Sequence, residues 1–572
     1  MNKLLSFIGQ NLFSIDIYNV RKMKLFLCGG LLILSFFIIG YRTISLANIN
    51  KQVEVETLAK MKLEKEIEDK HIRGSIFDRE NNLLASTIKV SSLNINPYEV
   101  MNKHETIFKL KNIFPSTNTN TLLKKLNSKK RHVNLIREIS PEDHVKILKI
   151  GIEGINIESI NKRIYPGNTI AAHILGNTNI DGKGIAGIEK SFDDKLRIGK
   201  NINLSIHSGV QHILRTEIHK QINNYEAEGG AGIVMDVKTG EVYALASLPD
   251  YNANNYKKIL TTNTKLFNKA TKGIYELGST LKLITAAIAY ESKLVRDNDV
   301  FDVSKPLKIS SRTISDYHPL NYAINIPEVI VRSSNIGSAK IAEKFGSKTQ
   351  LKYLKSLGLM NKLSLEIPEV GKPSVITDKK LLTTMTISYG HSIAITPIHL
   401  TSATATIVNG GIKVNPTLLV PTTKNNNQRI FSEKTSLQMR SIMRLVVNNK
   451  YGTAKKANAP GYVVGGKTGT AEKLNKSGGY SKKKNIAAFT AAFPMNKPRF
   501  VITIIIDNPK GQLKSFGYRD RTGGWVAAPV VKKIVTRIAP ILNIKPTLDS
   551  SKVLTENLIQ YKIRGNKKGA EL

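Results

Sequence analysis

The sequence has 572 residues, and its hydrophobic content of 41 % excludes an intrinsically disordered chain. Its 85 Lys and Arg residues exceed the 44 Asp and Glu residues by 41, but the basic runs are short and carry no interleaved aromatic residues. We therefore expect a basic solvated surface and no nucleic acid partner. The single cysteine, Cys28, excludes an intrachain disulfide, and the scattered histidines predict no metal site and no cofactor.

Residues 25–41 form an apolar segment without a charged side chain. These 17 residues lie near the short end of what crosses a hydrocarbon layer of ~30 Å, and the flanking Lys24 and Arg42 can extend the span by snorkelling. Four basic residues precede the segment and only Arg42 follows closely. This asymmetry predicts a single-pass anchor in the cytoplasmic (inner) membrane, with the N-terminus in the cytoplasm and the later residues outside, in the periplasm.

A cleaved signal peptide is the alternative for this segment, because the small residues Ser45 and Ala47 follow it at the spacing of a cleavage site. The apolar run is, however, longer than the roughly 7–15 residues of a usual signal core. We therefore expect an uncleaved anchor.

The rest of the chain predicts a multidomain protein of the α/β (α+β) class. Residues 48–72 read as a helix, and 73–200 mix short strands and helices. Beyond about 201, strands are predicted at 232–236, 241–246, 462–473, 486–494 and 500–507, and helices at 279–292, 327–344, 383–408 and 526–541. The predicted parts are a cytoplasmic tail (1–24), the transmembrane anchor (25–41), a first domain (42–200), a second domain (201–545) and a loose basic tail (546–572).

Ser279 and Lys282 form a Ser-x-x-Lys motif at the start of an apolar helical stretch. Ser279 would stand at the helix N-terminus, where free N–H groups favour developing negative charge, and Lys282 would share its face. A serine hydroxyl needs a base, and Lys282 can act as one only if burial or nearby cations keep its amine neutral. The same tetrad begins at Ser159, for example, but opens no apolar helix there.

Ser333 and Asn335 form a second motif, Ser-x-Asn, after the predicted end of a helix. The hydroxyl of Ser333 can relay a proton to a leaving amine, and the amide of Asn335 can hold a substrate carbonyl. Taken alone, the motif fits a simple helix-terminal turn equally well.

A third motif, Lys-Thr-Gly-Thr, lies in the predicted strand 462–473. Lys467 and the hydroxyls of Thr468 and Thr470 can hold an anionic group, and the missing side chain of Gly469 would let an extended peptide add to the strand. The N–H groups of Thr470 and Ser279 can form an oxyanion hole, which is worth ~2.7–4 kcal/mol per donor.

Residues 461–468 also fit the phosphate-loop pattern G-x-x-x-x-G-K-[ST]. That loop needs a strand before it and a helix after it. Here Ala459 and Pro460 precede the pattern and no helical apolar period follows, so we reject a nucleotide site.

The three motifs occur in the order found in penicillin-binding proteins and class A β-lactamases. Their surroundings, 268–282 and 465–473, resemble class B penicillin-binding proteins. The segments 73–79, 163–166 and 187–189 resemble the non-catalytic pedestal (dimerisation-type) domain of that family, and 389–391 and 527–530 also fit. The size and motif set are most similar to FtsI-type, division-specific D,D-transpeptidases.

This resemblance implies a pedestal at 42–200 and, at 201–545, a penicillin-binding domain with a central antiparallel sheet flanked by helices. It implies that Ser279 is acylated by the D-Ala-D-Ala end of a peptidoglycan stem peptide. Terminal D-Ala then leaves, and an amine of a neighbouring strand attacks. The implied catalytic residues are Ser279, Lys282, Ser333, Asn335 and Lys467. β-Lactams would be covalent inhibitors, and a membrane-embedded glycan polymerase and divisome proteins would be partners.

Three alternatives stay open. An elongation-specific class B transpeptidase would share every catalytic residue, a D,D-carboxypeptidase or β-lactamase would use water as the acceptor, and an inactive scaffold would have lost the chemistry. Two positions depart from the family pattern. Leu277 stands where proline is common and Asn81 where glycine is common. Asn81 tolerates left-handed backbone, so that change is mild.

Overall fold

A computed structural model describes residues 22–23, 25–45, 72–258, 263–310, 312–421, 428–474, 479–510, 512–513, 519–547 and 558–564. The chain forms two compact units, Met1–Ile72 and Arg73–Leu572. The helix predicted at 48–72 lies outside the described residues apart from Ile72.

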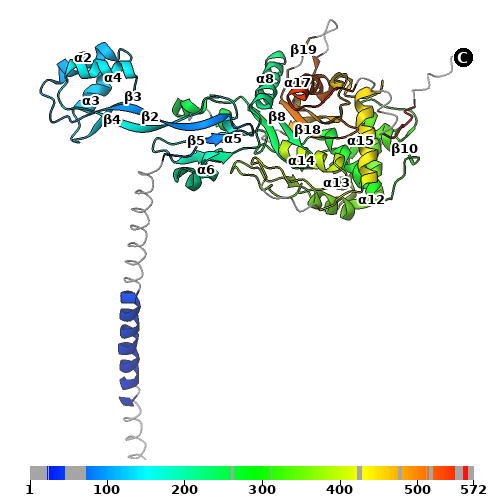
Figure 1. The fold of residues 1–572 in the computed structure, drawn as a ribbon. Helices are drawn as coiled ribbons and strands as arrows, with labels where there is room; N and C mark the ends of the chain where they lie inside the picture. Colours follow the sequence, from blue (N-terminus) through cyan, green and yellow to red (C-terminus); the bar gives the residue numbers. More distant parts are fainter. Residues whose placement is uncertain are drawn as a thin grey trace, which may run out of the picture. The chain divides into compact units, whose positions relative to one another are not determined.

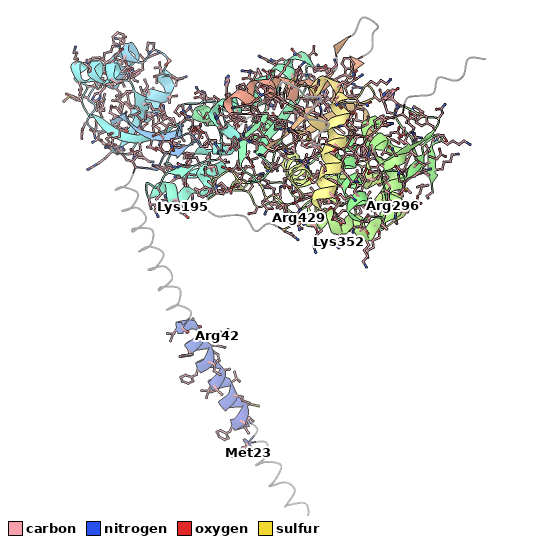
Figure 2. All side chains as sticks on the ribbon, turned by 45° about the vertical axis from the view of Figure 1, so that its right-hand side comes forward. Met23, Arg42, Lys195, Arg296, Lys352 and Arg429 are labelled. Atoms are coloured by element: carbon pink, nitrogen blue, oxygen red, sulfur yellow. The ribbon has the colours of Figure 1, made fainter. Side chains whose placement is uncertain are left out.

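The first unit contains a helix over Leu25–Ser45, between the labels Met23 and Arg42 in Figure 2. It has 21 residues and a mean hydropathy of 2.0, and none of it is buried. In the described part of the chain, this is the one helix long and apolar enough to cross a membrane. The apolar helix predicted at 25–41 is therefore confirmed and extends four residues further, although a signal sequence would fit the same length and composition.

The second unit begins with a ribbon of long strands. β2 (Leu83–Ile95) pairs antiparallel with β4 (Ile155–Ile164) over most of its length, and its later half also pairs with β3 (Val133–Ile139). The helices α2 (Lys103–Ile113), α3 (Thr119–Leu126) and α4 (Pro141–Ile150) gather at one end of these strands (Figure 1). They close a separate small core, which we call the head core; it includes Leu93, Ile95, Leu110, Leu122 and Leu126.

The base of this ribbon is held by a buried ion network around Glu189. Arg73 and Arg163 each contact the Glu189 carboxylate, at 2.6 and 2.7 Å, and the Glu189 side chain is fully buried. Arg73 also contacts Asp193 at 2.7 Å. The network joins β4 to α6 (Gly187–Ser191) and α7 (Asp193–Arg197). The other short elements of this part of the chain are β1 (Ile76–Phe77), α5 (Ala172–Leu175), β5 (Asn177–Thr178), β6 (Gly184–Ala186) and β7 (Ile202–Asn203).

A five-stranded sheet forms the centre of the following region, in the order β16-β17-β18-β8-β9 with every pair antiparallel. The strands are β8 (Gly229–Asp236), β9 (Val242–Leu248), β16 (Gly465–Leu474), β17 (Tyr480–Phe493) and β18 (Phe500–Asp507). All five predicted strands and the β8–β9 hairpin are confirmed. The strand found after Gly461 also confirms that the phosphate-loop pattern has no helix behind it.

Helices cover both faces of this sheet (Figure 1). Gly232 of β8 faces Leu214 and Ile218 of α8 (Ser208–Asn224), which packs beside α17 (Ala528–Ile541). Thr503 points to the opposite face of the sheet, where its hydroxyl forms a hydrogen bond with that of Thr490. The Thr490 hydroxyl is also hydrogen-bonded to Thr404 of α14 (Pro397–Val408). The central antiparallel sheet flanked by helices is therefore the observed fold.

Two helices predicted as continuous are broken, and one break carries the second motif. The prediction at 327–344 becomes α11 (Ile326–Arg332) and α12 (Asn335–Ser356), because Ser333 adopts left-handed backbone with φ +62°. The prediction at 383–408 becomes α13 (Leu381–Ser388), β15 (Ile393–Ala394) and α14, where Thr396 caps the new start and Pro397 occupies the first turn. Both stretches were wrong as continuous helices, although the helix end predicted directly before Ser333 is confirmed.

The loose tail predicted at 546–572 is wrong for residues 558–564. Leu558 is buried, and the Ile559 N–H donates to Ser441 Oγ at 2.9 Å on α15 (Glu433–Asn448). Arg564 donates through its backbone N–H to the buried Glu328 carboxylate at 2.7 Å. An apolar side chain and specific polar partners hold this segment against the unit, although its composition is polar and basic.

Short elements complete the described unit: η1 (Ala253–Lys258), α9 (Asn263–Leu266), η2 (Gly278–Leu281), α10 (Lys282–Glu291), β10 (Val300–Asp302), β11 (Leu307–Ile309), β12 (Arg312–Ile314), β13 (Ala323–Asn325), β14 (Ser374–Val375), η3 (Lys455–Ala457), β19 (Gln512–Leu513), β20 (Arg519–Asp520) and α16 (Gly523–Val526).

Candidate active site

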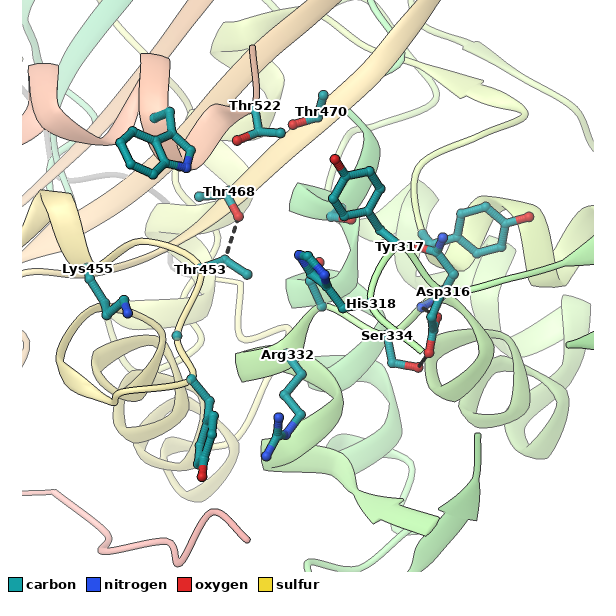
Figure 3. A pocket seen from close by; sticks show the side chains of 18 of the residues that line it. Asp316, Tyr317, His318, Arg332, Ser334, Thr453, Lys455, Thr468, Thr470 and Thr522 are labelled. Atoms are coloured by element: carbon teal, nitrogen blue, oxygen red, sulfur yellow. Dashed lines mark hydrogen bonds between the residues drawn. The ribbon is translucent and has the colours of Figure 1, made fainter. Parts of the chain in front are cut away.

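The three motifs meet at one cleft of about 910 Å³. Five residues proposed from the sequence line it, namely Ser279, Ser333, Asn335, Thr468 and Thr470. Figure 3 shows Asp316 beside Ser334 on one side of this cleft and Thr453 bonded to Thr468 on another. Lys282 and Lys467 are fully buried, and the contacts described next place their amines at its floor.

Ser279 stands in a tight turn that leads into the buried helix α10. The turn η2 starts at Gly278, whose φ is +53°, and Lys282 begins α10. A Cβ on Gly278 would lie 2.7 Å from the Thr470 carbonyl oxygen, so only glycine suits both the backbone conformation and the contact. The prediction that Ser279 opens an apolar helix is confirmed, since α10 is buried from Lys282 to Tyr290.

The Lys282 amine reaches the second motif. Its Nζ lies 2.6 Å from the Ser333 carbonyl oxygen, 2.8 Å from Asn335 Oδ1 and 3.3 Å from Ser333 Oγ. The left-handed conformation of Ser333 turns the chain sharply between α11 and α12, so that both its carbonyl and its hydroxyl meet this amine.

Lys467 reaches the same hydroxyl from the third motif. Lys467 Nζ donates to Ser333 Oγ at 2.9 Å and to the Thr468 carbonyl oxygen at 3.2 Å. Ser333 Oγ therefore lies between two buried amines. The second and third motifs, which lie more than 130 residues apart in the sequence, therefore meet at this hydroxyl.

Burial changes the protonation of both lysines. It lowers the pKa of Lys282 to about 7, although the nearby Asp316 carboxylate works in the opposite direction. Burial and the neighbouring Lys282 also lower the pKa of Lys467. A neutral Lys282 can accept a proton, whereas Lys467 gains its charge most readily when an anionic group enters the cleft.

The third motif approaches the Ser279 turn closely. A Cβ on Gly469 would lie 2.3 Å from the Leu277 carbonyl oxygen, so the missing side chain makes room for this turn. The sequence instead predicted that the missing side chain of Gly469 makes space for a bound peptide. β16 is still an edge strand of the sheet, and Thr468 and Thr470 face the cleft.

Asp316 is a site residue that sequence reasoning missed. It lies between β12 and β13, and its carboxylate accepts hydrogen bonds from Ser334 Oγ (2.6 Å), from the Ile336 N–H (3.0 Å) and from the Asn335 N–H. The neighbouring Ser315 carbonyl oxygen accepts from Asn335 Nδ2 at 2.9 Å. Together these contacts aim Asn335 Oδ1 at Lys282. A single aspartate in a loop has no local pattern that would reveal this role.

The comparisons with known proteins agree with this geometry. The penicillin binding protein transpeptidase domain family matches residues 230–536, and the penicillin-binding protein dimerisation domain family matches residues 68–224. The chain is similar to the probable peptidoglycan D,D-transpeptidase FtsI of Caulobacter vibrioides, with 35 % identity over 83 % of this chain and 82 % of that protein. It is 29 % identical to the peptidoglycan D,D-transpeptidase FtsI of Escherichia coli, over 91 % of this chain and 92 % of that protein.

The fold is also similar to solved structures. Penicillin-binding protein 3 from Mycobacterium tuberculosis, complexed with ampicillin, superposes with a TM-score of 0.68 at 22 % identity, over 86 % of this chain and 99 % of that one. The structure of the same protein complexed with aztreonam gives a TM-score of 0.67. The matched domains and the full-length relatives together show that this chain belongs to the penicillin-binding-protein transpeptidase family, with an FtsI-like arrangement of dimerisation and transpeptidase domains.

Proposed function

We propose that this protein is a peptidoglycan D,D-transpeptidase that cross-links stem peptides through an acyl-enzyme on Ser279. The observation that carries the proposal is the pair of buried amines, Lys282 and Lys467, that meet at Ser333 Oγ. Such an arrangement supplies a base and a path for the proton in the cleft that Ser279 also lines. The names of the FtsI relatives support the same activity.

The acylation step uses the residues of the cleft. Neutral Lys282 takes the proton of Ser279 Oγ as this oxygen attacks the carbonyl carbon of the penultimate D-Ala. The N–H groups of Ser279 and Thr470 stabilise the oxyanion. The proton then passes from Lys282 through Ser333 to the nitrogen of the leaving D-Ala, and Asn335 holds a substrate amide. Lys467, Thr468 and Thr470 bind the terminal carboxylate, which favours the charged form of Lys467.

The proposed setting is the cytoplasmic membrane. In this proposal the helix Leu25–Ser45 is an uncleaved single-pass anchor, residues 42–200 are the pedestal and 201–545 the transpeptidase domain, outside the membrane. The basic residues before the helix support this orientation. The FtsI names of the relatives favour a role in the septal wall, with a membrane-embedded glycan polymerase and divisome proteins as partners. Residues shared by all class B enzymes leave the elongation-specific role as the second candidate.

Fluorescent penicillin tests the chemistry directly. We expect covalent labelling of the full-length protein in detergent, with the adduct on Ser279 in peptide mass spectra, and no labelling of Ser279→Ala. Ser159→Ala is the matched control, because Ser159 begins another Ser-x-x-Lys sequence on the exposed part of β4. Labelling that survives in Ser279→Ala would overturn the assignment of the nucleophile.

A further inference from the structure

His391 lies beside the backbone that carries Ser279. A Cβ on Gly390 would lie only 2.0 Å from the Gly278 carbonyl oxygen, and Gly390 has φ +91°. The two segments therefore touch at Gly278 and Gly390, the residues directly before Ser279 and His391. Both Ser279 and His391 then line the same cleft.

The imidazole of His391 is held in a fixed frame. Its ring contacts those of Tyr389 and Tyr480, with centroids 5.2 and 5.5 Å away. The Glu276 carboxylate joins the surrounding segments, because it accepts from the Ser392 N–H at 3.0 Å and from the Tyr480 hydroxyl at 2.9 Å. The ring is thus positioned between Tyr389 of its own segment and Tyr480, and Glu276 ties these two segments together.

The chemistry of His391 suits a proton acceptor. The ring lines the cleft, and its Nδ1 is buried without a hydrogen-bond partner among the described residues, so Nε2 is the nitrogen that an acceptor in the cleft can reach. Burial and the cation of Lys282 lower the pKa of His391, while the carboxylates of Glu276 and Glu472 raise it. The imidazole is therefore neutral at neutral pH. The titratable groups that face it or pack on it are Glu276, Lys282, Tyr389, Glu472 and Tyr480.

Proton balance distinguishes an amine acceptor from water. An acceptor amine arrives as an ammonium ion and must lose two protons to become an amide. One of these returns to Ser279 Oγ, which Lys282 can deliver, but the other must leave the site. Hydrolysis of the acyl-enzyme needs only the first transfer. Attack by an amine therefore requires a second base that neither acylation nor hydrolysis requires.

We propose that His391 is this second base: it removes the first proton from the ammonium group of the acceptor strand, an inference that rests on the proposed transpeptidase function. The N–H bond breaks, its electron pair stays on nitrogen and forms the new C–N bond to the acyl carbon, and the proton leaves from the imidazole to solvent. The second proton passes through Lys282 to Ser279 Oγ as the C–O bond of the acyl-enzyme breaks.

The test uses the full-length protein in detergent with an acyl-D-alanyl thioester as donor. The acceptor is either D-alanine, an ammonium ion at pH 7, or hydroxylamine, which is uncharged there. His391→Gln and His391→Phe are compared with His219→Gln, an exposed histidine of α8. With D-alanine, we expect the ratio of aminolysis to hydrolysis to fall about a hundredfold in both His391 variants, as loss of a general base predicts. With hydroxylamine the ratio stays near wild type.

The rate of acylation by fluorescent penicillin separates this role from a structural one. It remains near wild type if His391 acts as the base for the acceptor. An equal loss with both acceptors, a parallel loss of acylation, or an unchanged ratio with D-alanine would each overturn the proposal. Failure of the transpeptidase function itself would be seen separately, as labelling of Ser279→Ala or as a lack of labelling in the wild type.

Discussion

Lys282 and Lys467 share one hydroxyl group, because Ser333 Oγ lies 3.3 Å from the first amine and 2.9 Å from the second. Both side chains are fully buried, which lowers the pKa of both amines, and the Lys282 cation lowers the pKa of Lys467 further. The pair therefore holds fewer protons than two exposed lysines would. This deficit makes one amine available as a base at neutral pH.

The rate of acylation should follow the titration of Lys282. Its pKa of about 7 lies far below the ordinary value, and the reactive form is the neutral amine. The neutral fraction rises with pH, so acylation by fluorescent penicillin should climb with pH up to about 7 and then level off. At one pH unit below that pKa, the rate should be about tenfold lower. A stopped-flow profile that stays flat from acid to alkaline pH would contradict this assignment, and Lys282→Ala should lose acylation by about 100-fold or more.

Asp316 should influence both the pH profile of acylation and the orientation of Asn335. Its negative charge favours the protonated form of Lys282, so Asp316→Asn should move the acylation profile toward lower pH. Asp316→Ala should also misalign Asn335 and remove hydrogen bonds at the start of α12, at a cost of about 1 kcal/mol in stability. The two variants are compared by acylation against pH and by thermal unfolding. An Asp316→Asn profile that moves to higher pH would refute the electrostatic role.

Gly390 should tolerate no side chain. A Cβ there meets the Gly278 carbonyl, so Gly390→Ala must displace the turn that carries Ser279. A misplacement of about 1 Å can reduce the rate about 100-fold, and we expect a loss of that order in penicillin labelling. Gly346→Ala is the control, because Gly346 also has positive φ (+70°) but nothing within 4 Å of its Cβ position. Equal labelling of the two variants would show that the Gly390–Gly278 contact is dispensable.

The ion network at the base of the pedestal should dominate its stability. Arg163→Ala leaves the buried Glu189 carboxylate short of a partner, which should cost about 3–5 kcal/mol in the free energy of unfolding. Lys162→Ala is the matched control at the adjacent residue. Its ion pair with Glu138 is partly exposed and should contribute less than about 1 kcal/mol. Chemical denaturation of the two variants measures the difference, and similar losses would argue against a structural role for the network.

Local sequence patterns were sufficient for much of the fold and for the motif residues of the site. Apolar runs bounded by turns predicted the five sheet strands. A glycine followed by an apolar stretch predicted the position of Ser279 at the start of a helix. The break at Gly390 was missed, because apolar residues continue on both sides of it. The second motif indicated a helix end before Ser333, but the helical pattern alone ran through it. Thr396 and Pro397 offered a signal for the restart of α14, which was not used.

Tertiary contacts account for what the sequence did not reveal. Asp316 acts through backbone groups of Asn335 and Ile336, about 20 residues away, and no periodicity or spacing rule reports such a contact. Residues 558–564 look like a polar tail because their anchors, Ser441 and Glu328, belong to distant helices. The sequence indicated that Gly469 must lack a side chain, but only the structure shows that the reason is the close approach of the Leu277 carbonyl.

The strand β2 has a mechanical consequence. It contributes Leu84 and Ala85 to the large core that also contains the five-stranded sheet, and Leu93 and Ile95 to the head core, without a loop between them. Its 13 residues span about 40 Å and are paired with β4 over most of that length. A force applied to the helices around the head core is therefore transmitted to the catalytic region through the paired strands β2 and β4. No flexible loop lies along β2 to absorb it.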